Sequence, residues 1–322
     1  MRHARSFWIA SLFLLPLIVP PAMASQYPDK PVRVLVGFPA GGSADIVARM
    51  VTGAVAKTSK FEFVVENRSG AGGNIAFDGA ANAAPDGYTL LFSTPGVAIN
   101  PSLYRKVSFT QSDFTPITLV GEAPLMLMVR PSLGIKTLAG LIKESRKDPE
   151  AIRFASSGSG SSSHLAAEVL RSMSGMQYLH VPYRGGGAAM TDLIGDRVDM
   201  TVLPIAESMP YVNDKKLLAL GQTGSRRSAI APDVPTIAQA GVDGYSVTTW
   251  YMLLGPKNLP EPIVNALYEA FSQVVGSEDL KKSLEARGVD VINADPQETA
   301  EFLKQQSESW AKAIEASGTK LD

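Results

Sequence analysis

The strongest constraint on the fold is an apolar segment that runs directly into a glycine turn and then into a helix. Residues 32–38 are apolar almost throughout, which is typical of a strand covered on both faces. Gly41 and Gly42 follow, and the next apolar residues recur at helical spacing: Ile46, Val47, Met50, Val51, Ala54 and Val55. A covered strand followed at once by a helix predicts a strand-helix-strand unit, and therefore an α/β protein.

The same alternation of short apolar runs and helical patterns continues along most of the chain. Further strands are expected at residues 63–65, 90–92, 125–129, 152–155, 179–181, 200–203, 217–220 and 249–254. Further helices are expected at residues 75–83, 138–147, 163–174, 188–194, 262–275 and 297–316. Segments rich in Pro and turn residues, at 95–101, 231–235 and 256–262, are expected to be loops. In the last helix, one stripe is predicted to pack against a domain surface: Ala300, Leu303, Ser307, Trp310 and Ile314.

The first 24 residues have the pattern of a secretory signal peptide. Arg2 and Arg5 precede an apolar stretch at residues 7–19, and an Ala-Met-Ala sequence at residues 22–24 suits cleavage. The stretch is short against the roughly 20 residues that span a bilayer, although an uncleaved anchor stays an alternative. We expect residues 1–24 to be removed, a mature chain that starts near Ser25 and is not inserted in the membrane, and a periplasmic location.

Composition excludes several classes of protein. The 30 basic and 31 acidic residues nearly balance, so neither nucleic acid nor an anionic membrane surface is an expected partner. The chain has no cysteine, which excludes thiol catalysis and thiolate metal sites. A length of 322 residues exceeds what one core usually organises, so two domains are expected.

Three loops made of small residues precede predicted helices, at residues 37–45, 156–163 and 183–187. The first N–H groups of a helix have no partner within the helix, so such a junction suits a bound anion. Hydroxyl and amide donors can hold a carboxylate without a fixed cation. We therefore expect a cleft that binds a carboxylate.

Charged residues near these loops each admit two interpretations. Arg184 suits either a bidentate contact to a carboxylate or a solvated loop position. Asp45 lies in the first turn of its helix, where capping is slightly favoured over ligand selection. Asp199, just before a predicted strand, suits capping or a domain contact equally.

The motifs that an enzyme or a metalloprotein would need are missing. His180 falls inside an apolar strand pattern, and His164 opens a helix, which gives no metal-ligand spacing. The sequence contains neither GxxxxGK[ST] nor GxSxG, and glycines 158 and 160 match only half of a dinucleotide fingerprint. We expect no cofactor, no metal and no enzymatic activity. An enzyme would have to draw on Ser162, His164 and Asp45, which no motif links.

The sequence resembles the extracytoplasmic solute receptors of tripartite tricarboxylate transporters, also called Bug receptors. The matching segments are YPDKP at residues 27–31, PAGGSAD at 39–45, NRSGAGGN at 67–74, PDGYTL at 85–90, SSHL at 162–165, VPYRGGG at 181–187 and PDVPT at 232–236. Their order and spacing cover essentially the whole mature chain.

The resemblance implies a two-lobe, type II periplasmic binding protein fold with a mixed, mainly parallel sheet in each lobe. The chain is expected to cross between lobes near residues 120–124 and 244–248. The first lobe would comprise residues 25–123 and 247–322, and the second lobe residues 124–246. A carboxylate would lie between the lobes, held by main-chain N–H groups, hydroxyls and water.

Carried over by position, the resemblance also implies contact residues. From the first lobe these are Phe38, Ala40, Gly41, Gly42, Asp45, Ser93 and Thr94. From the second lobe they are Ser156, Ser157, Gly158, Ser162, His164, Tyr183, Arg184 and Gly185. The chain departs from the family at Leu203 and Pro204, where many members have a polar pair, and at Arg184, which replaces a common lysine.

The expected function is capture of a small carboxylate in the periplasm and its delivery to a two-component membrane permease by a monomeric receptor. The resemblance implies a ligand among di- and tricarboxylates, acidic amino acids and aromatic carboxylates. Recognition by main-chain groups leaves the choice among them open. A ligand sensor for a membrane histidine kinase is an alternative, and a periplasmic enzyme on the same scaffold is a weaker one.

Overall fold

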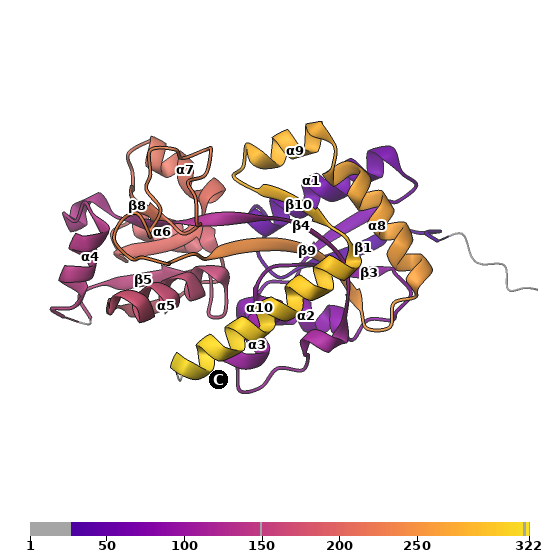
Figure 1. Ribbon diagram of the computed structural model, residues 1–322, viewed down its shortest axis with the longest axis horizontal. Coiled ribbons are helices and arrows are strands. Elements are labelled where there is room, and N and C mark those ends of the chain that lie inside the picture. The colour runs from indigo at the N-terminus through magenta and orange to yellow at the C-terminus, as the bar shows by residue number, and fades with distance from the viewer. Residues whose placement is uncertain (1–26, 149, 318–319, 322) are drawn as a thin grey trace, which may run out of the picture.

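Two α/β lobes lie side by side, joined by long strands that run from one lobe into the other (Figure 1). The computed structural model describes residues 27–148, 150–317 and 320–321, so the expected signal peptide lies outside the described residues. Within the described part of the chain, no helix combines the length and the apolar character that a bilayer crossing requires.

The elements alternate as the sequence predicts. The strands are β1 (Val32–Val36), β2 (Phe63–Asn67), β3 (Thr89–Ser93), β4 (Phe114–Val129), β5 (Arg153–Ser156), β6 (Leu179–Pro182), β7 (Met200–Pro204), β8 (Leu218–Gln222), β9 (Thr248–Pro256) and β10 (Asp290–Ala294). The helices are α1 (Ser43–Thr58), α2 (Asn74–Ala81), α3 (Gly96–Leu103), α4 (Leu138–Ser145), α5 (Ser162–Ser174), α6 (Gly186–Ile194), α7 (Ile205–Asn213), α8 (Glu261–Val275), α9 (Glu278–Glu285) and α10 (Pro296–Ser317). Short 3₁₀ turns, η1 (Ala71–Gly73), η2 (Gln111–Asp113) and η3 (Pro131–Leu133), complete the order.

Strand β4 belongs to both lobes. Its first part pairs with β9 and β10, up to the pair of Pro124 with Thr248, and its last residues pair with β7 and β8, beginning at Leu125. We call β2-β1-β3-β9 with the first part of β4 the first lobe, and β7-β5-β6 with β8 and the end of β4 the second lobe. Strands β1, β2 and β3 pair in parallel, as do β5, β6 and β7, whereas every pair that includes β4 or β9 is antiparallel. The expected mixed α/β fold is confirmed.

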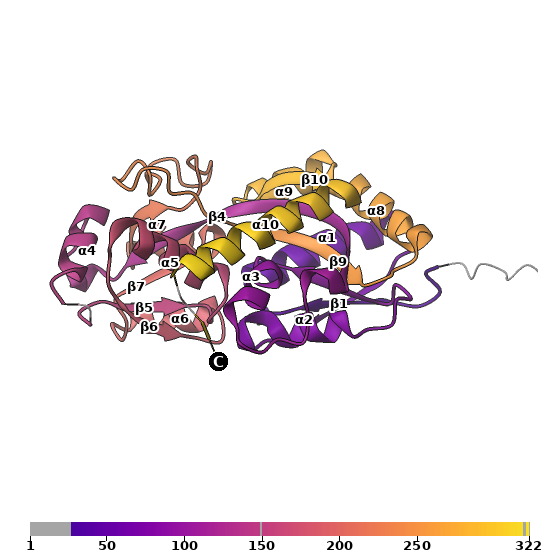
Figure 2. The ribbon, with the colours of Figure 1, turned by 60° about the horizontal axis from the view of Figure 1, so that its bottom comes forward.

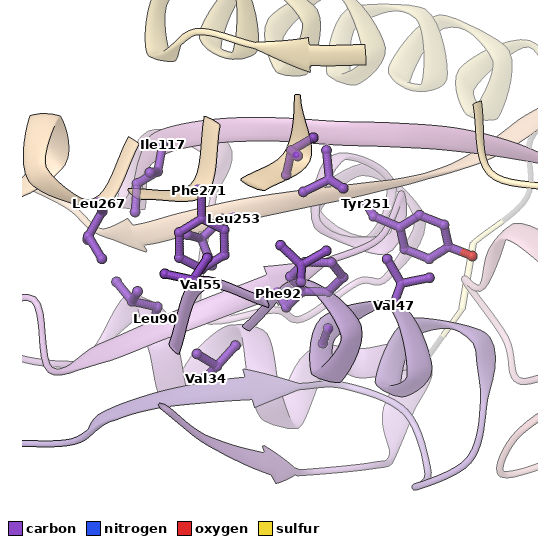
Figure 3. Close-up of a cluster of buried hydrophobic side chains, with 14 of the residues drawn as sticks. Val34, Val47, Val55, Leu90, Phe92, Ile117, Tyr251, Leu253, Leu267 and Phe271 are labelled. Carbon is purple, nitrogen blue, oxygen red and sulfur yellow. The ribbon is translucent and has the colours of Figure 1, made fainter. Parts of the chain in front are cut away.

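Each sheet is covered by helices on both faces, which explains the uninterrupted apolar strands. In the first lobe, α1, α8 and α9 pack on one face and α2, α3 and α10 on the other (Figure 1). Figure 3 shows the first of these cores, where Val34, Leu90 and Phe92 of the sheet lie among side chains of α1 and α8. In the second lobe, α4 and α5 cover one face, and α6 and α7 the other.

The last helix packs as its apolar stripe predicts. Leu303 and Ile314 are buried, and Trp310 packs against core residues of the second lobe. Figures 1 and 2 show α10 leaving the first lobe and running toward the second. The stripe therefore serves contacts in both lobes.

The expectation of a loop at residues 95–101 is wrong, because α3 occupies most of this segment. Pro95 precedes the helix and Pro101 lies inside it. Val97, Ala98 and Ile99 are nearly or fully buried, so tertiary packing outweighs the hydrogen bond that a proline removes. Four further elements were not expected, namely the first part of β4 and all of α7, α9 and β10.

Asp199 is a structural ion-pair residue at the base of the second sheet. Its carboxylate is almost fully buried and accepts hydrogen bonds from the N–H and guanidinium of Arg153 and from Arg130 Nε at 2.8–3.1 Å. Burial opposes ionisation, but these donors outweigh it and lower the pKa of Asp199. The sequence left a capping role and a domain contact open for Asp199. The observed bonds join strand ends within the second lobe.

Replacing Tyr245 by Phe tests one buried hydrogen bond of the second lobe. Its hydroxyl donates to the Ala166 carbonyl at 2.8 Å, and the residue is 1% exposed. We expect Tyr245→Phe to lower the free energy of unfolding by about 1 kcal/mol, the usual contribution of such a bond. Urea unfolding measures this difference. Tyr268→Phe is the control, because Tyr268 is a half-buried residue whose hydroxyl donates to none of the described residues. An equal loss in both variants would contradict the assignment.

Candidate functional site

A cavity of about 670 Å³ lies where the two lobes meet. The first lobe contributes the β1–α1 loop and the start of α1, and the second contributes the loops before α5 and α6 and the start of α7. Thr249 and Tyr251 of β9 also line it. The loops gather here because the carboxyl ends of the parallel strands β1, β5 and β6 face this space, which is the usual binding edge of such sheets.

The β1–α1 turn is fixed by bonds within the chain. The Gly41 N–H donates to Asp45 Oδ2 at 2.8 Å, and the Gly42 N–H donates to the Pro39 carbonyl at 3.2 Å. Asp45 Oδ1 also accepts from Arg49 Nε at 2.8 Å and from the Asn67 side-chain amide at 3.0 Å. Asp45 is 3% exposed and does not line the cavity, which agrees with the capping role that the sequence slightly favoured.

Serines of the β5–α5 loop form part of the opposite wall. Ser157, Ser162 and Ser163 line the cavity. The Ser162 hydroxyl donates to Thr249 Oγ1 at 3.1 Å, and Ser163 Oγ accepts the Ser157 N–H at 3.3 Å. Hydroxyl groups of its serines therefore order this loop.

A stacked pair of histidines supports this loop from behind. The rings of His164 and His180 lie 4.2 Å apart with an interplanar angle of 11°. His164 Nδ1 accepts the Gly160 N–H at 3.2 Å, and His180 Nε2 is hydrogen-bonded to Ser156 Oγ at 2.7 Å. Burial lowers the pKa of each histidine to about 4, so both are neutral at pH 7. Neither ring lines the cavity.

The loop before α6 divides between two cavities. Arg184 is exposed and lines the main cavity, as does Gly185. Tyr183 and Gly158 instead line an adjoining cavity of about 640 Å³, which Phe38, Ser157 and Arg184 share. The Tyr183 hydroxyl donates to Asp192 Oδ2 at 2.7 Å. Burial and this hydrogen bond raise the pKa of Tyr183 to about 12, so it stays protonated.

The structure thus brings most of the predicted site residues together, but not all. Those that line the main cavity are Phe38, Ala40, Gly41, Gly42, Thr94, Ser157, Ser162, Arg184 and Gly185. Those buried behind its walls are Asp45, Ser93, Ser156 and His164. Their contact with a ligand stays a prediction.

Glu207 is a lining residue that sequence reasoning missed. It lies in the first turn of α7, a helix that was not expected, three residues after Pro204. Its Oε1 accepts the Ser43 N–H at the start of α1, so it links the two lobes. Burial raises the pKa of Glu207, and the Ser43 N–H opposes that shift. A sequence signal that could have found Glu207 is the strand that ends at Pro204 and is followed at once by a helix with an acid in its first turn.

Two other missed groups lie in or beside the cavity. The Tyr251 hydroxyl is hydrogen-bonded to Ser43 Oγ. Figure 3 shows the ring at the end of the first-lobe core with its oxygen directed away from Phe92. Arg287, which follows α9, also lines the cavity and is exposed. A cavity with charged groups of both signs is therefore more polar than the glycine and serine loops alone imply.

No group of three or more His, Asp or Glu side chains among residues 27–148, 150–317 and 320–321 is placed to hold a metal ion.

Comparison with known proteins agrees with this architecture. Residues 47–319 match the model of the tripartite tricarboxylate transporter family receptor, TctC. Protein BugT of Bordetella pertussis is 32% identical over 310 residues, which is 94% of each chain. A Rhodopseudomonas palustris protein solved with adipate superposes with a TM-score of 0.87 and 30% identity, over 92% of this chain and 100% of that one. MatC from the same species, solved with bound malate, gives a TM-score of 0.85 and 31% identity, over 89% and 100%.

The family match covers most of the chain, and the relatives match over nearly their whole lengths. The resemblance seen in the short motifs is thereby confirmed, together with the two-lobe fold. The chain belongs to the tripartite tricarboxylate transporter receptor family, TctC, whose members include the Bug proteins.

Proposed function

We propose that this receptor captures a small carboxylate between its lobes in the periplasm and delivers it to a tripartite tricarboxylate-type permease. The observation that carries the proposal is the cavity between the lobes, lined by hydroxyl groups and by the starts of α5 and α6. Helix starts attract anions. Similar proteins solved with adipate and malate support an organic acid as the ligand.

Capture would be a hinge motion. We assign residues 25–123 and 247–322 to one moving body and residues 124–246 to the other, with the hinge where β4 changes partners, at Pro124 and Leu125. Ligand contacts from both lobes exist together only when the cavity is shut, so binding favours the closed form. Binding energy alone would perform the function, and we propose no catalytic step.

Arg184→Ala tests whether the exposed guanidinium of the α6 loop contacts the ligand. If Arg184 pairs directly with a carboxylate, its loss is expected to weaken binding by about 1.5–3 kcal/mol. Isothermal calorimetry measures the change. Arg184→Lys is the matched control, because it keeps the charge but loses the bidentate geometry. Unchanged affinity in both variants would favour the alternative interpretation, in which Arg184 is a solvated loop residue.

A thermal-shift screen over organic acids tests the proposed function itself. A ligand at about 100 times its dissociation constant is expected to stabilise the folded state by roughly 2.7 kcal/mol. Growth of a deletion strain on the acids that score then separates transport from sensing. Absence of stabilisation by every acid would contradict the proposed function.

A further inference from the structure

Glu207 places a carboxylate where three helices begin. The side chain extends from the first turn of α7 to the first N–H of α1, at Ser43. It also passes so close to Gly186, the first residue of α6, that a Cβ at Gly186 would overlap Oε2. Helix N-termini stabilise negative charge, so this end of the cavity already holds an anion that belongs to the protein.

Glu207 has no cationic partner among the described residues. Arg184 and Arg287 line the same cavity, but neither forms an ion pair with it within residues 27–148, 150–317 and 320–321. The only hydrogen bond that Glu207 accepts from that part of the chain is the one to Oε1, so its Oε2 accepts none. Glu207 is half-buried and lines the cavity, so a cation or a strong donor on a ligand can reach this oxygen, where a carboxylate would favour it.

A ligand carboxylate would be repelled at this corner. The N–H groups of Gly41, Gly42 and Ser43 all donate within the chain, to Asp45, Pro39 and Glu207. A second carboxylate would therefore meet no free donor at that turn and would lie against a like charge. Among the other polar residues of the lining, the Ser157 hydroxyl and the Arg184 guanidinium donate to no described residue, so they can receive one carboxylate.

We propose that Glu207 is a specificity-determining residue, which makes the cavity select an acid that also carries a protonated amine over the matching dicarboxylate. The inference rests on the proposed function, since it concerns the ligand of the same cavity. The ligand carboxylate would point toward Ser157 and Arg184, and its ammonium would donate to Glu207.

Matched pairs of acids test the inference, because each pair exchanges one carboxylate for an aminomethyl group of similar size. The pairs are succinate and 4-aminobutyrate, adipate and 6-aminohexanoate, and terephthalate and 4-(aminomethyl)benzoate. We expect the purified protein to bind the amine of at least one pair at least tenfold more tightly than its diacid by calorimetry. Glu207→Gln is expected to weaken that amine tenfold or more and to strengthen the diacid.

The control variant is Glu261→Gln, which neutralises an exposed acid in the first turn of α8 and is expected to change neither affinity. Circular dichroism melting establishes that each variant is folded. If diacids bind the natural protein as tightly as the amines, or if Glu207→Gln changes both affinities equally, the inference is overturned while the proposed function stands. If no acid of either kind binds, the proposed function fails and the inference falls with it.

Discussion

A Gly72→Ala variant is expected to bind its ligand about 100-fold more weakly while remaining folded. Gly72 lies in η1 of the first lobe and faces the Ser159 carbonyl of the second, so closely that a Cβ would overlap that oxygen. The overlapping atom belongs to the backbone, which cannot move aside as a flexible side chain can. The same carbonyl accepts the Tyr104 hydroxyl at 2.8 Å, another contact between the lobes. Alanine would therefore oppose closure and leave each lobe intact.

Gly134→Ala is the matched control for backbone strain. Gly72 has φ +64° and Gly134 has φ +75°, and nothing lies within 4 Å of a Cβ at Gly134. Both alanines should lower the free energy of unfolding by about 1–2 kcal/mol, the cost of a left-handed conformation. Only Gly72→Ala should lose affinity, measured with the acid that the thermal-shift screen identifies.

Small-angle X-ray scattering gives a second measurement that needs no ligand. We expect a larger radius of gyration for Gly72→Ala than for Gly134→Ala, because only the first change separates the lobes. Equal radii together with unchanged affinity would show that η1 does not approach the serine loop when the receptor closes.

The stability of the protein is expected to fall steeply as the pH drops below 6.5. His164 and His180 have pKa values lowered to about 4 in the folded state by burial, whereas an unfolded histidine titrates near 6.5. The unfolded chain therefore binds protons first. The stability associated with each neutral histidine is fully present above pH 6.5 and is lost between pH 6.5 and about 4, at about 1.4 kcal/mol per pH unit.

Urea unfolding at pH 7, 6 and 5 measures this slope. Other groups face the pair: Glu168 Oε1 lies 3.7 Å from His164 Nε2, and Arg171 disfavours a positive charge on both rings. His164→Asn keeps a small polar group that can accept the Gly160 N–H and cannot titrate in this range. We expect it to remove about half of the slope. An unchanged slope in this variant would contradict the assignment.

Sequence patterning predicted the elements whose own residues specify them. The apolar runs that became β1, β3, β7 and β9 are covered on both faces, so hydrophobicity alone marked them. Helix α3 escaped prediction because its two prolines indicate a loop, and burial against α2 and α10 decides otherwise. Strand β10 escaped because Asp290 and Asn293 interrupt its apolar pattern, and pairing with β4 makes it a strand.

The part of the candidate site that lies in loops of small residues could be predicted from the sequence. Glycine and serine junctions can be recognised locally, and the structure brings three of them to one cavity. A junction of strand, proline and helix marks the position of Glu207, but its role could not be predicted in this way, because that role depends on the contact with Ser43, 164 residues away in sequence. The sequence also could not show that Arg184 lines the cavity whereas His164 is buried behind it, because it does not tell which side of a loop faces a cavity.

The sequence by itself determined the α/β class, the recurrent junctions of strand, small-residue loop and helix, and, through its motifs, the receptor family. Hydrophobic periodicity and turn chemistry act over a few residues, so they can be read without a fold. Only the tertiary structure decided which donors are already used within the chain and which charge stands in the cavity. Such facts depend on distances between lobes, and the chain fixes these only after two separate cores have packed.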